Sequence, residues 1–346
     1  MAVKHAHDFF FQWHLTDRCN LACTHCYQEG AKTAEMSLSQ VKAVIEEIAD
    51  MIEIWSWNYG IDFSPSFNIT GGEPFLHRDI FEILEELRRR RFEIFLLSNG
   101  TLINKDKARF LSWLGMKGVQ VSIEGPEEIH DSIRGRGSFA SSLRGIEHLV
   151  NEGVMVSLNV TLSDINADRL PDMVALSSSL GVQRLGFSRL VPYGRGAELM
   201  DRILERDRVR DLYQRIFSIE SDGLKIVTGD PLASQMFRSS NSLDEGTVPL
   251  GGCAAGISGL TLLPDGTVLP CRRLPVPIGN VKKDSLREIW AISEVLNALR
   301  DKSRYKGKCG KCGKWANCRG CRAIAYAYSR LTGMPDFLSE DPQCYY

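Results

Sequence analysis

Short runs of apolar, β-branched or aromatic residues alternate with longer segments of helical periodicity along the first two-thirds of the chain. The run at 9–15 predicts a strand, and the apolar residues of 38–54 recur at the spacing of a helix. Further strands are expected at 67–70, 92–97, 119–123, 154–160 and 184–188, and further helices at 79–91, 105–114, 138–152, 167–180 and 202–218. Repeated strand–helix units indicate a parallel sheet with right-handed crossovers. Because there are six such units rather than eight, we expect an α/β fold built as a partial (β/α)6 barrel of the TIM type.

The last third of the chain has a different pattern. Residues 219–250 are rich in turn-forming residues and predict a connector. Two short apolar runs, 259–263 and 268–270, flank the turn sequence Pro264-Asp265-Gly266 and predict a β-hairpin, and a helix is expected over 286–299. We therefore expect three parts: a barrel at 1–218, the connector at 219–250 and a small cysteine-rich domain at 251–346.

The charge balance and the N-terminal segment exclude several classes of protein. Lys and Arg total 42 against 43 Asp and Glu, so no basic field favours nucleic acid. The apolar stretch near the N-terminus is short and interrupted by polar residues, which is typical of neither a signal peptide nor a membrane span. We expect a cytoplasmic protein that binds neither nucleic acid nor membrane.

The ten cysteines are distributed unevenly: three lie within 19–26, none lies within 27–252 and seven lie within 253–344. Disulfide frameworks are typical of small secreted domains, and this chain is long and shows no secretory signal. Ligation of metal by thiolates is the better interpretation.

The first group has the spacing Cys19-x3-Cys23-x2-Cys26 and directly follows the first expected strand. In parallel barrels, active sites gather at the carboxyl ends of the strands. Three thiolates can hold three corners of a cubane cluster and leave one iron open to a small molecule, whereas electron-transfer clusters normally have four cysteines. The alternative is a zinc site with His14 or His25 as the fourth ligand, although zinc favours two C-x2-C arms.

This trio, with Tyr27 after the third cysteine, resembles the signature of the radical S-adenosylmethionine (SAM) superfamily. Further motifs of that family follow the second, third and fourth expected strands in order, and the resemblance covers about residues 9–215. It implies that Glu73 binds the SAM amino group and that Arg134 binds its carboxylate, a contact that suits a guanidinium. The SAM-contacting residues implied by the resemblance are Tyr27, Gly71, Gly72, Glu73, Pro74, Ser98, Asn99, Ser122, Glu124 and Arg134.

The resemblance also implies a mechanism. A [4Fe–4S] cluster on Cys19, Cys23 and Cys26 would bind SAM at its open iron. Reduction would cleave SAM to methionine and a 5′-deoxyadenosyl radical, which abstracts a hydrogen atom from the substrate. The protein would orient the substrate and exclude water and oxygen. A reductant such as flavodoxin or ferredoxin is an expected partner.

The second cysteine group resembles the SPASM domain, the auxiliary-cluster extension of peptide-modifying radical SAM enzymes. The resemblance implies two auxiliary [4Fe–4S] clusters. The distal one would be held by Cys309, Cys312, Cys318 and Cys344, and the proximal one by Cys253, Cys271 and Cys321 with an open or non-cysteine fourth position. The last short gap is two residues here and usually three in the family, so the partition stays open. The alternative, a zinc ribbon on the four closely spaced cysteines, leaves three cysteines unexplained.

Three substrate classes fit this resemblance. The first is a ribosomally made peptide or protein that receives a thioether, a C–C bond or an oxidised side chain; only about eight residues precede the first strand, so a separate peptide-recognition protein is a possible partner. The second is a tetrapyrrole of haem or haem d1 biosynthesis, because the 308–344 segment also resembles those proteins and arginines could pair with propionates: Arg189, Arg195, Arg272 and Arg273. The third, sulfatase-type maturation, is weakened because Arg272 follows Cys271 where that family has an Asp.

A non-enzymatic iron–sulfur electron carrier is the remaining alternative, and the open three-cysteine site argues against it. His130, Asp131, Arg189 and Tyr193 are the candidates for substrate contact or proton transfer, because each follows an expected strand. No general base stands out among them.

Overall fold

A single sheet of ten strands organises the protein, seen in a computed structural model that describes residues 7–29, 34–221, 223–236 and 247–346. Its strand order is β10-β9-β8-β1-β2-β3-β4-β5-β6-β7, and neighbouring strands from β1 to β7 are parallel. The parallel strands are β1 (His7–His14), β2 (Phe63–Thr70), β3 (Glu93–Ser98), β4 (Gly118–Ser122), β5 (Val156–Leu162), β6 (Arg184–Arg189) and β7 (Lys225–Thr228). The expected α/β partial barrel is confirmed.

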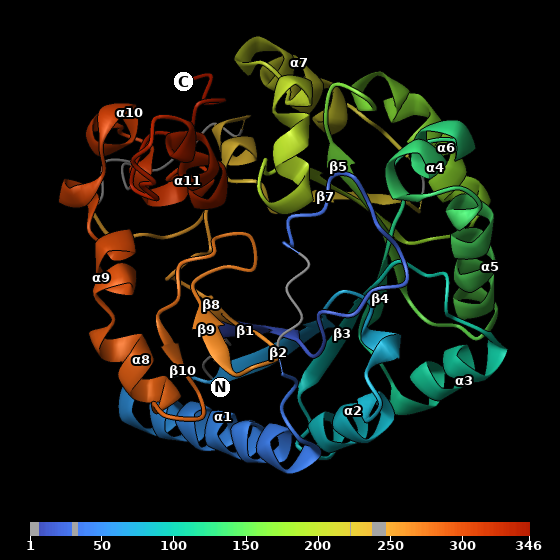
Figure 1. Cartoon of the computed structure of the whole chain (residues 1–346), viewed down its shortest axis with the longest axis horizontal. Helices are drawn as coiled ribbons and strands as arrows, with labels where there is room; N and C mark the ends of the chain where they lie inside the picture. Colours follow the sequence, from blue (N-terminus) through green and yellow to red (C-terminus); the bar gives the residue numbers. More distant parts are fainter. Residues whose placement is uncertain (1–6, 30–33, 222, 237–246) are drawn as a thin grey trace, which may run out of the picture.

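Helices cover the outer face of the curved sheet (Figure 1). The barrel helices are α1 (Leu38–Tyr59), α2 (Ile80–Arg89), α3 (Lys105–Leu114), α4 (Glu127–Arg134), α5 (Ser138–Asn151), α6 (Leu170–Ser179) and α7 (Arg206–Phe217). Successive strand residues point to opposite faces, so apolar residues such as Phe67 and Val121 pack in the main core while polar residues such as Gln120 and Asn159 line the interior. The polar lining leaves the barrel interior suited to a ligand.

The C-terminal part continues the same sheet. Its elements are β8 (Gly259–Leu262), β9 (Thr267–Leu269), β10 (Gly279–Asn280), α8 (Leu286–Ile292), α9 (Glu294–Arg300), α10 (Gly307–Lys311) and α11 (Arg322–Leu331). Strands β8 and β9 form the predicted hairpin, and β8 also pairs with β1 in parallel. Trp290 on α8 packs against Phe9 and Trp55, with ring centroids 4.9 and 5.9 Å apart. The cysteine-rich part is therefore joined to the barrel by both backbone pairing and core packing.

Short 3-10 helices connect these elements: η1 (Pro74–Leu76), η2 (Ala167–Arg169), η3 (Gly194–Arg202), η4 (Pro231–Met236), η6 (Lys302–Arg304) and η7 (Trp315–Asn317). Several details differ from the sequence expectations, which also did not include β10, α10 and α11. Strand β7 lies within the expected connector, of which residues 237–246 fall outside the described part of the chain. Helix α4 was not predicted, and the helix expected over 286–299 is broken at Ser293, whose side chain caps α9 by accepting the N–H of Leu296. The proposed domain boundaries stay a prediction.

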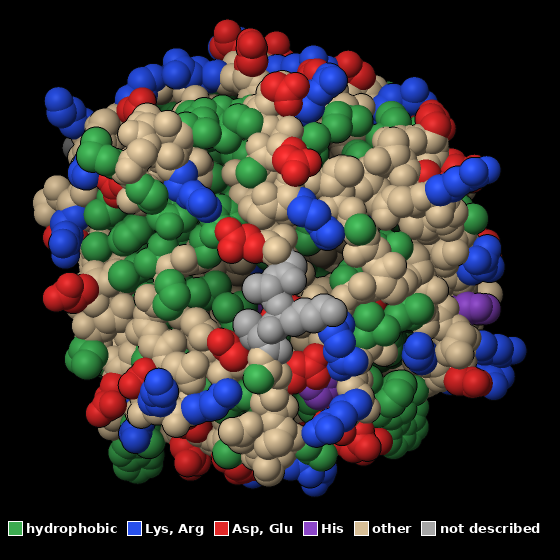
Figure 2. All heavy atoms as spheres, viewed as in Figure 1, with side chains coloured by type: hydrophobic (Ala, Val, Ile, Leu, Met, Phe, Trp, Pro, Cys, Tyr) green, Lys and Arg blue, Asp and Glu red, His purple; other side chains and the backbone are tan. Residues whose placement is uncertain are grey.

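Charged side chains of both signs are interspersed over the face seen in Figure 2, and hydrophobic side chains gather around α9 to α11. Among the described residues, no helix combines the length and the hydrophobicity needed to cross a bilayer.

Candidate active site

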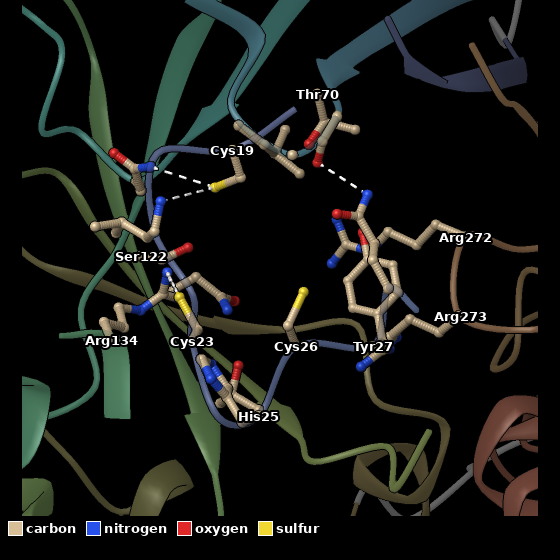
Figure 3. Close-up of a pocket in the computed structure, with 18 of the residues that line it drawn as sticks. Cys19, Cys23, His25, Cys26, Tyr27, Thr70, Ser122, Arg134, Arg272 and Arg273 are labelled. Atoms are coloured by element: carbon tan, nitrogen blue, oxygen red, sulfur yellow. Dashed lines mark hydrogen bonds between the residues drawn. The ribbon is translucent and has the colours of Figure 1, made fainter. Parts of the chain in front are cut away.

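A cavity of about 410 Å³ opens at the carboxyl ends of the parallel strands (Figure 3). Loops after β1 to β6 form most of its wall, and residues 272–273 of the C-terminal part complete it. Of the residues predicted for the site, the lining includes Cys19, Cys23, Cys26, Tyr27, Gly71, Gly72, Ser98, Asn99, Ser122, Arg134 and Arg189. The fold thus brings together motifs that are far apart in the sequence.

The thiols of Cys19, Cys23 and Cys26 face the same hollow (Figure 3). The Asn99 amide lies 3.9 Å from the Cys19 sulfur, and Arg134 Nη1 lies 3.8 Å from the Cys23 sulfur. Burial raises the pKa of both thiols above the ordinary value, so a bound metal would be needed to hold them as thiolates. Three convergent sulfurs with nearby N–H donors fit a cubane with one open corner.

The zinc alternative requires ligands that converge on a single ion. Among the described residues, no three His, Cys, Asp or Glu side chains do so. The Nε2 of His25 lies 3.1 Å from a carboxylate oxygen of Glu124, and the Nδ1 of His14 lies 3.1 Å from the Gln28 amide nitrogen. The second ring nitrogen of each histidine is buried without a hydrogen-bond partner among the described residues, so the preference for a cluster rests on the cysteine spacing.

The two glycines after β2 place the cysteine loop. The Gly72 N–H donates to the Thr16 carbonyl at 2.7 Å, and a Cβ built on Gly72 would lie 2.3 Å from the Arg18 carbonyl oxygen. A side chain cannot occupy that space, because backbone atoms of the β1 loop fill it. The glycine pair therefore lets the loop after β2 pack directly against the loop that carries the three cysteines.

Glu73 follows these glycines but lies outside the cavity lining. Its fully buried carboxylate accepts from the Ser98 hydroxyl at 2.9 Å and the Asn99 N–H at 2.9 Å. Burial raises the pKa of Glu73 to about 7, although these donors oppose the shift. The carboxylate thus anchors the Ser98–Asn99 loop, and the neighbouring Pro74 is buried as the first residue of η1. The contact with the SAM amino group implied for Glu73 stays a prediction.

Glu124, like Glu73, is buried outside the cavity lining, and it pairs with Arg134. Its buried carboxylate accepts from Arg134 Nε at 2.9 Å, the Thr161 N–H at 2.8 Å and His25 at 3.1 Å. Although burial opposes it, Arg134 and His25 hold the pKa of Glu124 well below its usual range. The remaining nitrogen of Arg134, Nη1, is left on the cavity side next to Cys23. Glu124 therefore positions Arg134 rather than lining the cavity itself.

Three of the four candidates for catalysis lie outside the cavity lining. His130 is buried with its Nδ1 accepting the Glu124 N–H, and burial lowers its pKa to about 4. Asp131 accepts the N–H groups of residues 137 and 139 at the start of α5. Tyr193 interacts with Glu29 and lies under the Arg330 guanidinium at 4.8 Å. These contacts describe structural roles, and the catalytic roles stay predictions.

Arg189 lines the cavity, but its guanidinium is engaged by protein acceptors. Its Nε donates to Asp230 at 2.7 Å, its Nη2 donates to Asp341 at 2.8 Å and its Nη1 donates to Gln343 at 2.7 Å. Asp230 and Asp341 raise the pKa of Arg189 against the effect of burial. Such a network describes a positioning residue rather than one with free donors for a substrate.

The floor of the cavity was not predicted from the sequence. It consists of polar residues at inward positions of β4, β5 and β6: Gln120, Asn159, Thr161 and Ser188. The sequence does contain a signal for these residues, because polar residues alternate with apolar ones along these strands. Such alternation places the polar side chains on the face of the sheet opposite the helices.

A second cavity of about 340 Å³ is lined by four cysteines, Cys309, Cys312, Cys318 and Cys344. The Gln235 amide lies 3.4 and 3.5 Å from the sulfurs of Cys318 and Cys344. Cys321 instead packs with Cys271 in a separate apolar cluster, and the Cys253 N–H donates to the Cys318 carbonyl. This grouping matches the partition implied by the resemblance despite the shorter gap; ligation itself stays a prediction.

Comparison with known proteins identifies two family matches. The model of the radical SAM superfamily matches residues 13–176, and that of the SPASM iron–sulfur cluster-binding domain matches residues 253–322. An AdoMet-dependent heme synthase of Methanosarcina barkeri is 33% identical, over 96% of this chain and 95% of its own. Mycofactocin maturase MftC of Mycolicibacterium smegmatis is 31% identical, over 96% of this chain and 81% of its own.

Solved structures share the fold. SuiB of Streptococcus suis, crystallised with its precursor peptide SuiA, has a TM-score of 0.74 at 15% identity, with 99% of this chain and 76% of that chain covered. At this identity the likeness concerns the fold alone.

Proposed function

This chain belongs to the radical SAM superfamily and carries a SPASM domain, and from this membership we propose that it modifies a side chain of a ribosomally made peptide or protein. It is an enzyme, and it binds SAM, a [4Fe–4S] cluster and auxiliary clusters. When bound, the first cluster and SAM supply a 5′-deoxyadenosyl radical that removes a hydrogen atom from the substrate. The modification would be a thioether, a C–C cross-link or an oxidation.

The protein's own groups have distinct tasks in this proposal. Cys19, Cys23 and Cys26 hold the cluster, and the Nη1 of Arg134 offers a donor to the SAM carboxylate. The loop at Ser98 and Asn99, anchored by the buried Glu73, lines the SAM side of the cavity. The polar floor orients the substrate side chain, and a reductant such as flavodoxin or ferredoxin supplies the electron.

One observation carries the proposal: the wall across the cavity from Cys19 and Cys23 includes Arg272 and Arg273, which directly follow Cys271 (Figure 3). The auxiliary part therefore borders the same cavity as the SAM site. A cavity of about 410 Å³ is near the lower end of small-molecule pockets, and the cluster and SAM would occupy much of it. The remaining space suits one side chain of a larger substrate, whose main chain stays at the open mouth.

The test is an anaerobic incubation of the reconstituted protein with SAM, a reductant and a short peptide encoded beside its gene. We expect 5′-deoxyadenosine and a SAM-dependent change in peptide mass. The control is the Cys19→Ala/Cys23→Ala/Cys26→Ala variant, which should lose both signals and retain about two-thirds of the iron. SAM cleavage without a mass change in any such peptide would argue against a peptide substrate.

A second candidate is the modification of a tetrapyrrole side chain. The full-length similarity to an AdoMet-dependent heme synthase favours it, because that match spans nearly all of both chains. Incubation with an iron tetrapyrrole that carries propionates, followed by mass analysis of the pigment, tests this candidate. An unchanged pigment under conditions that cleave SAM would remove it.

A further inference from the structure

Six arginines line the main cavity, and they differ in their partners. Arg18 pairs with Glu35 at 2.9 Å, Arg134 with Glu124 and Arg189 with two aspartates. Arg195 is exposed at the surface. The other two are Arg272 and Arg273. Like the exposed Arg195, neither forms an ion pair with a carboxylate of the described residues, and unlike Arg195 both are partly buried.

Arg272 lies against an aromatic ring. Its guanidinium lies over the ring of Tyr27 with 5.9 Å to the centroid. The charged or titratable groups that act on it electrostatically are Tyr27, Arg273 and Cys271. Arg134 and Arg189 differ, because carboxylates pair with them. A cation–π contact of this kind does not consume the N–H donors of the guanidinium, which stay available for a planar acceptor.

Arg273 belongs to a different environment. Its Nη1 donates to the Arg189 carbonyl at 3.3 Å, its buried Nε has no partner among the described residues, and the thiols of Cys321 and Cys271 act on it electrostatically. These groups place its charge beside the auxiliary cysteines. Arg272 is therefore the partly buried arginine of the cavity wall that pairs with no carboxylate and donates to no carbonyl among the described residues.

Leaving a cation partly desolvated without an anion is costly, and such sites are stabilised by a bound anion. Arg272 and Arg134 lie on opposite sides of the hollow in Figure 3. Arg134, beside Cys23, is placed for the SAM carboxylate, which leaves Arg272 for a second anion. Arginine binds carboxylates through two parallel N–H···O bonds, and this geometry also fixes the orientation of the bound group.

We propose that Arg272 is a specificity-determining residue that binds a carboxylate of the substrate on the wall opposite the SAM site. This inference rests on the proposed function and names a chemical feature of its substrate. In a peptide the carboxylate is an Asp or Glu side chain or the C-terminus; in a tetrapyrrole it is a propionate.

The test measures equilibrium binding to the anaerobically reconstituted full-length protein, without reduction. Two probe pairs are used: coproporphyrin III against its tetraamide, and a labelled Glu-containing peptide against the same peptide with Gln and an amidated C-terminus. We expect the acidic member of one pair to bind about tenfold or more tightly than its neutral match. Arg272→Gln should remove that preference, and Arg272→Lys should retain part of it.

The matched control is Arg287→Gln, an exposed position on α8 outside the cavity lining, which should keep the preference. A preference in the porphyrin pair identifies a tetrapyrrole source, and one in the peptide pair identifies a peptide source. Equal binding of acidic and neutral probes by the wild type, or an undiminished preference in Arg272→Gln, would overturn the proposal. If Arg272→Gln does not fold, the proposal is still tested by the preference of the wild type for the acidic probes and by the reduced preference expected of Arg272→Lys. The binding test does not depend on SAM cleavage, which is measured separately. A failure of the proposed function can therefore be distinguished from a failure of this inference.

Discussion

Arg189 and Asp341 form a buried two-pronged ion pair, with nitrogen–oxygen distances of 3.1 and 2.8 Å, across 152 positions of the chain. Arg189 ends β6, and Asp341 also accepts the Cys321 N–H at 2.8 Å. One carboxylate therefore ties the barrel to the segment that carries the auxiliary cysteines. The pair gives this end of the protein a defined position relative to the cavity.

Replacing Asp341 with Asn should destabilise the protein by about 3 kcal/mol, because removal of one partner leaves a buried charge only partly compensated. Urea unfolding of the reconstituted protein measures this, and the iron content should fall with the loss of an auxiliary site. Asp336→Asn is the control, since its partner Lys306 is largely exposed, and should cost less than about 1 kcal/mol. Equal stabilities of the two variants would contradict this role for Asp341.

Glu124→Gln should weaken SAM binding about tenfold, because Gln cannot hold both Arg134 and His25 by charge-assisted hydrogen bonds. Equilibrium dialysis with unreduced protein measures the affinity. The exposed Glu128 nearby provides the comparison, and Glu128→Gln should bind SAM as the wild type does. An unaltered affinity in Glu124→Gln would mean that Arg134 keeps its place without this carboxylate.

Gly72→Ala should displace the cysteine loop, since the added methyl would meet the Arg18 carbonyl. We expect a stability loss of about 1–3 kcal/mol and the loss of about one-third of the iron, with the auxiliary sites retained. Gly229→Ala is the matched control, because a Cβ there meets nothing within 4 Å. Full iron content in Gly72→Ala would show that the loop tolerates the displacement.

Glu73 should make stability fall as the pH rises through the neutral range. Burial raises its folded pKa to about 7 from 4.5, so between these values the folded protein binds more protons than the unfolded chain. Its contribution therefore declines from about pH 4.5 to 7, by about 3 kcal/mol in total. The Glu73→Gln side chain cannot titrate, so the stability of this variant relative to the wild type should increase over this pH range.

Urea unfolding of cluster-free protein at pH 5.0 and 7.5 checks this expectation. Glu53→Gln, at an exposed position of α1, serves as the control and should follow the wild type at both pH values. Parallel pH dependences of the wild type and Glu73→Gln would show that the hydrogen bonds from Ser98 and Asn99 outweigh burial.

Periodicity was sufficient to predict the barrel, because each of its first six strands is an apolar run followed by a helix. Strand β7 was missed because only Ile226 and Val227 supply an apolar signal, too short to separate from a loop. Helix α4 spans eight residues with a strongly charged first turn, Glu127 and Glu128, which offers no long periodic segment.

Motif spacing brought the cysteines and the SAM loops to the correct end of the barrel, but it could not give side-chain directions. Glu73 and Glu124 belong to the expected motifs, yet both carboxylates are directed into the protein, where they anchor neighbouring residues. The charge state of the cavity wall depends on which arginines have internal carboxylates. That pairing involves residues as distant as Arg189 and Asp341, so the special place of Arg272 was visible only in three dimensions.

The pairing of β8 with β1 makes the first strand an interior strand, hydrogen-bonded on both sides. A truncated protein that ended before residue 251 would expose the outer backbone edge of β1, an eight-residue strand rich in aromatic residues. Such an edge is a template for pairing with another chain. The barrel segment alone should therefore self-associate, because β8 of the cysteine-rich segment is the strand that covers this edge.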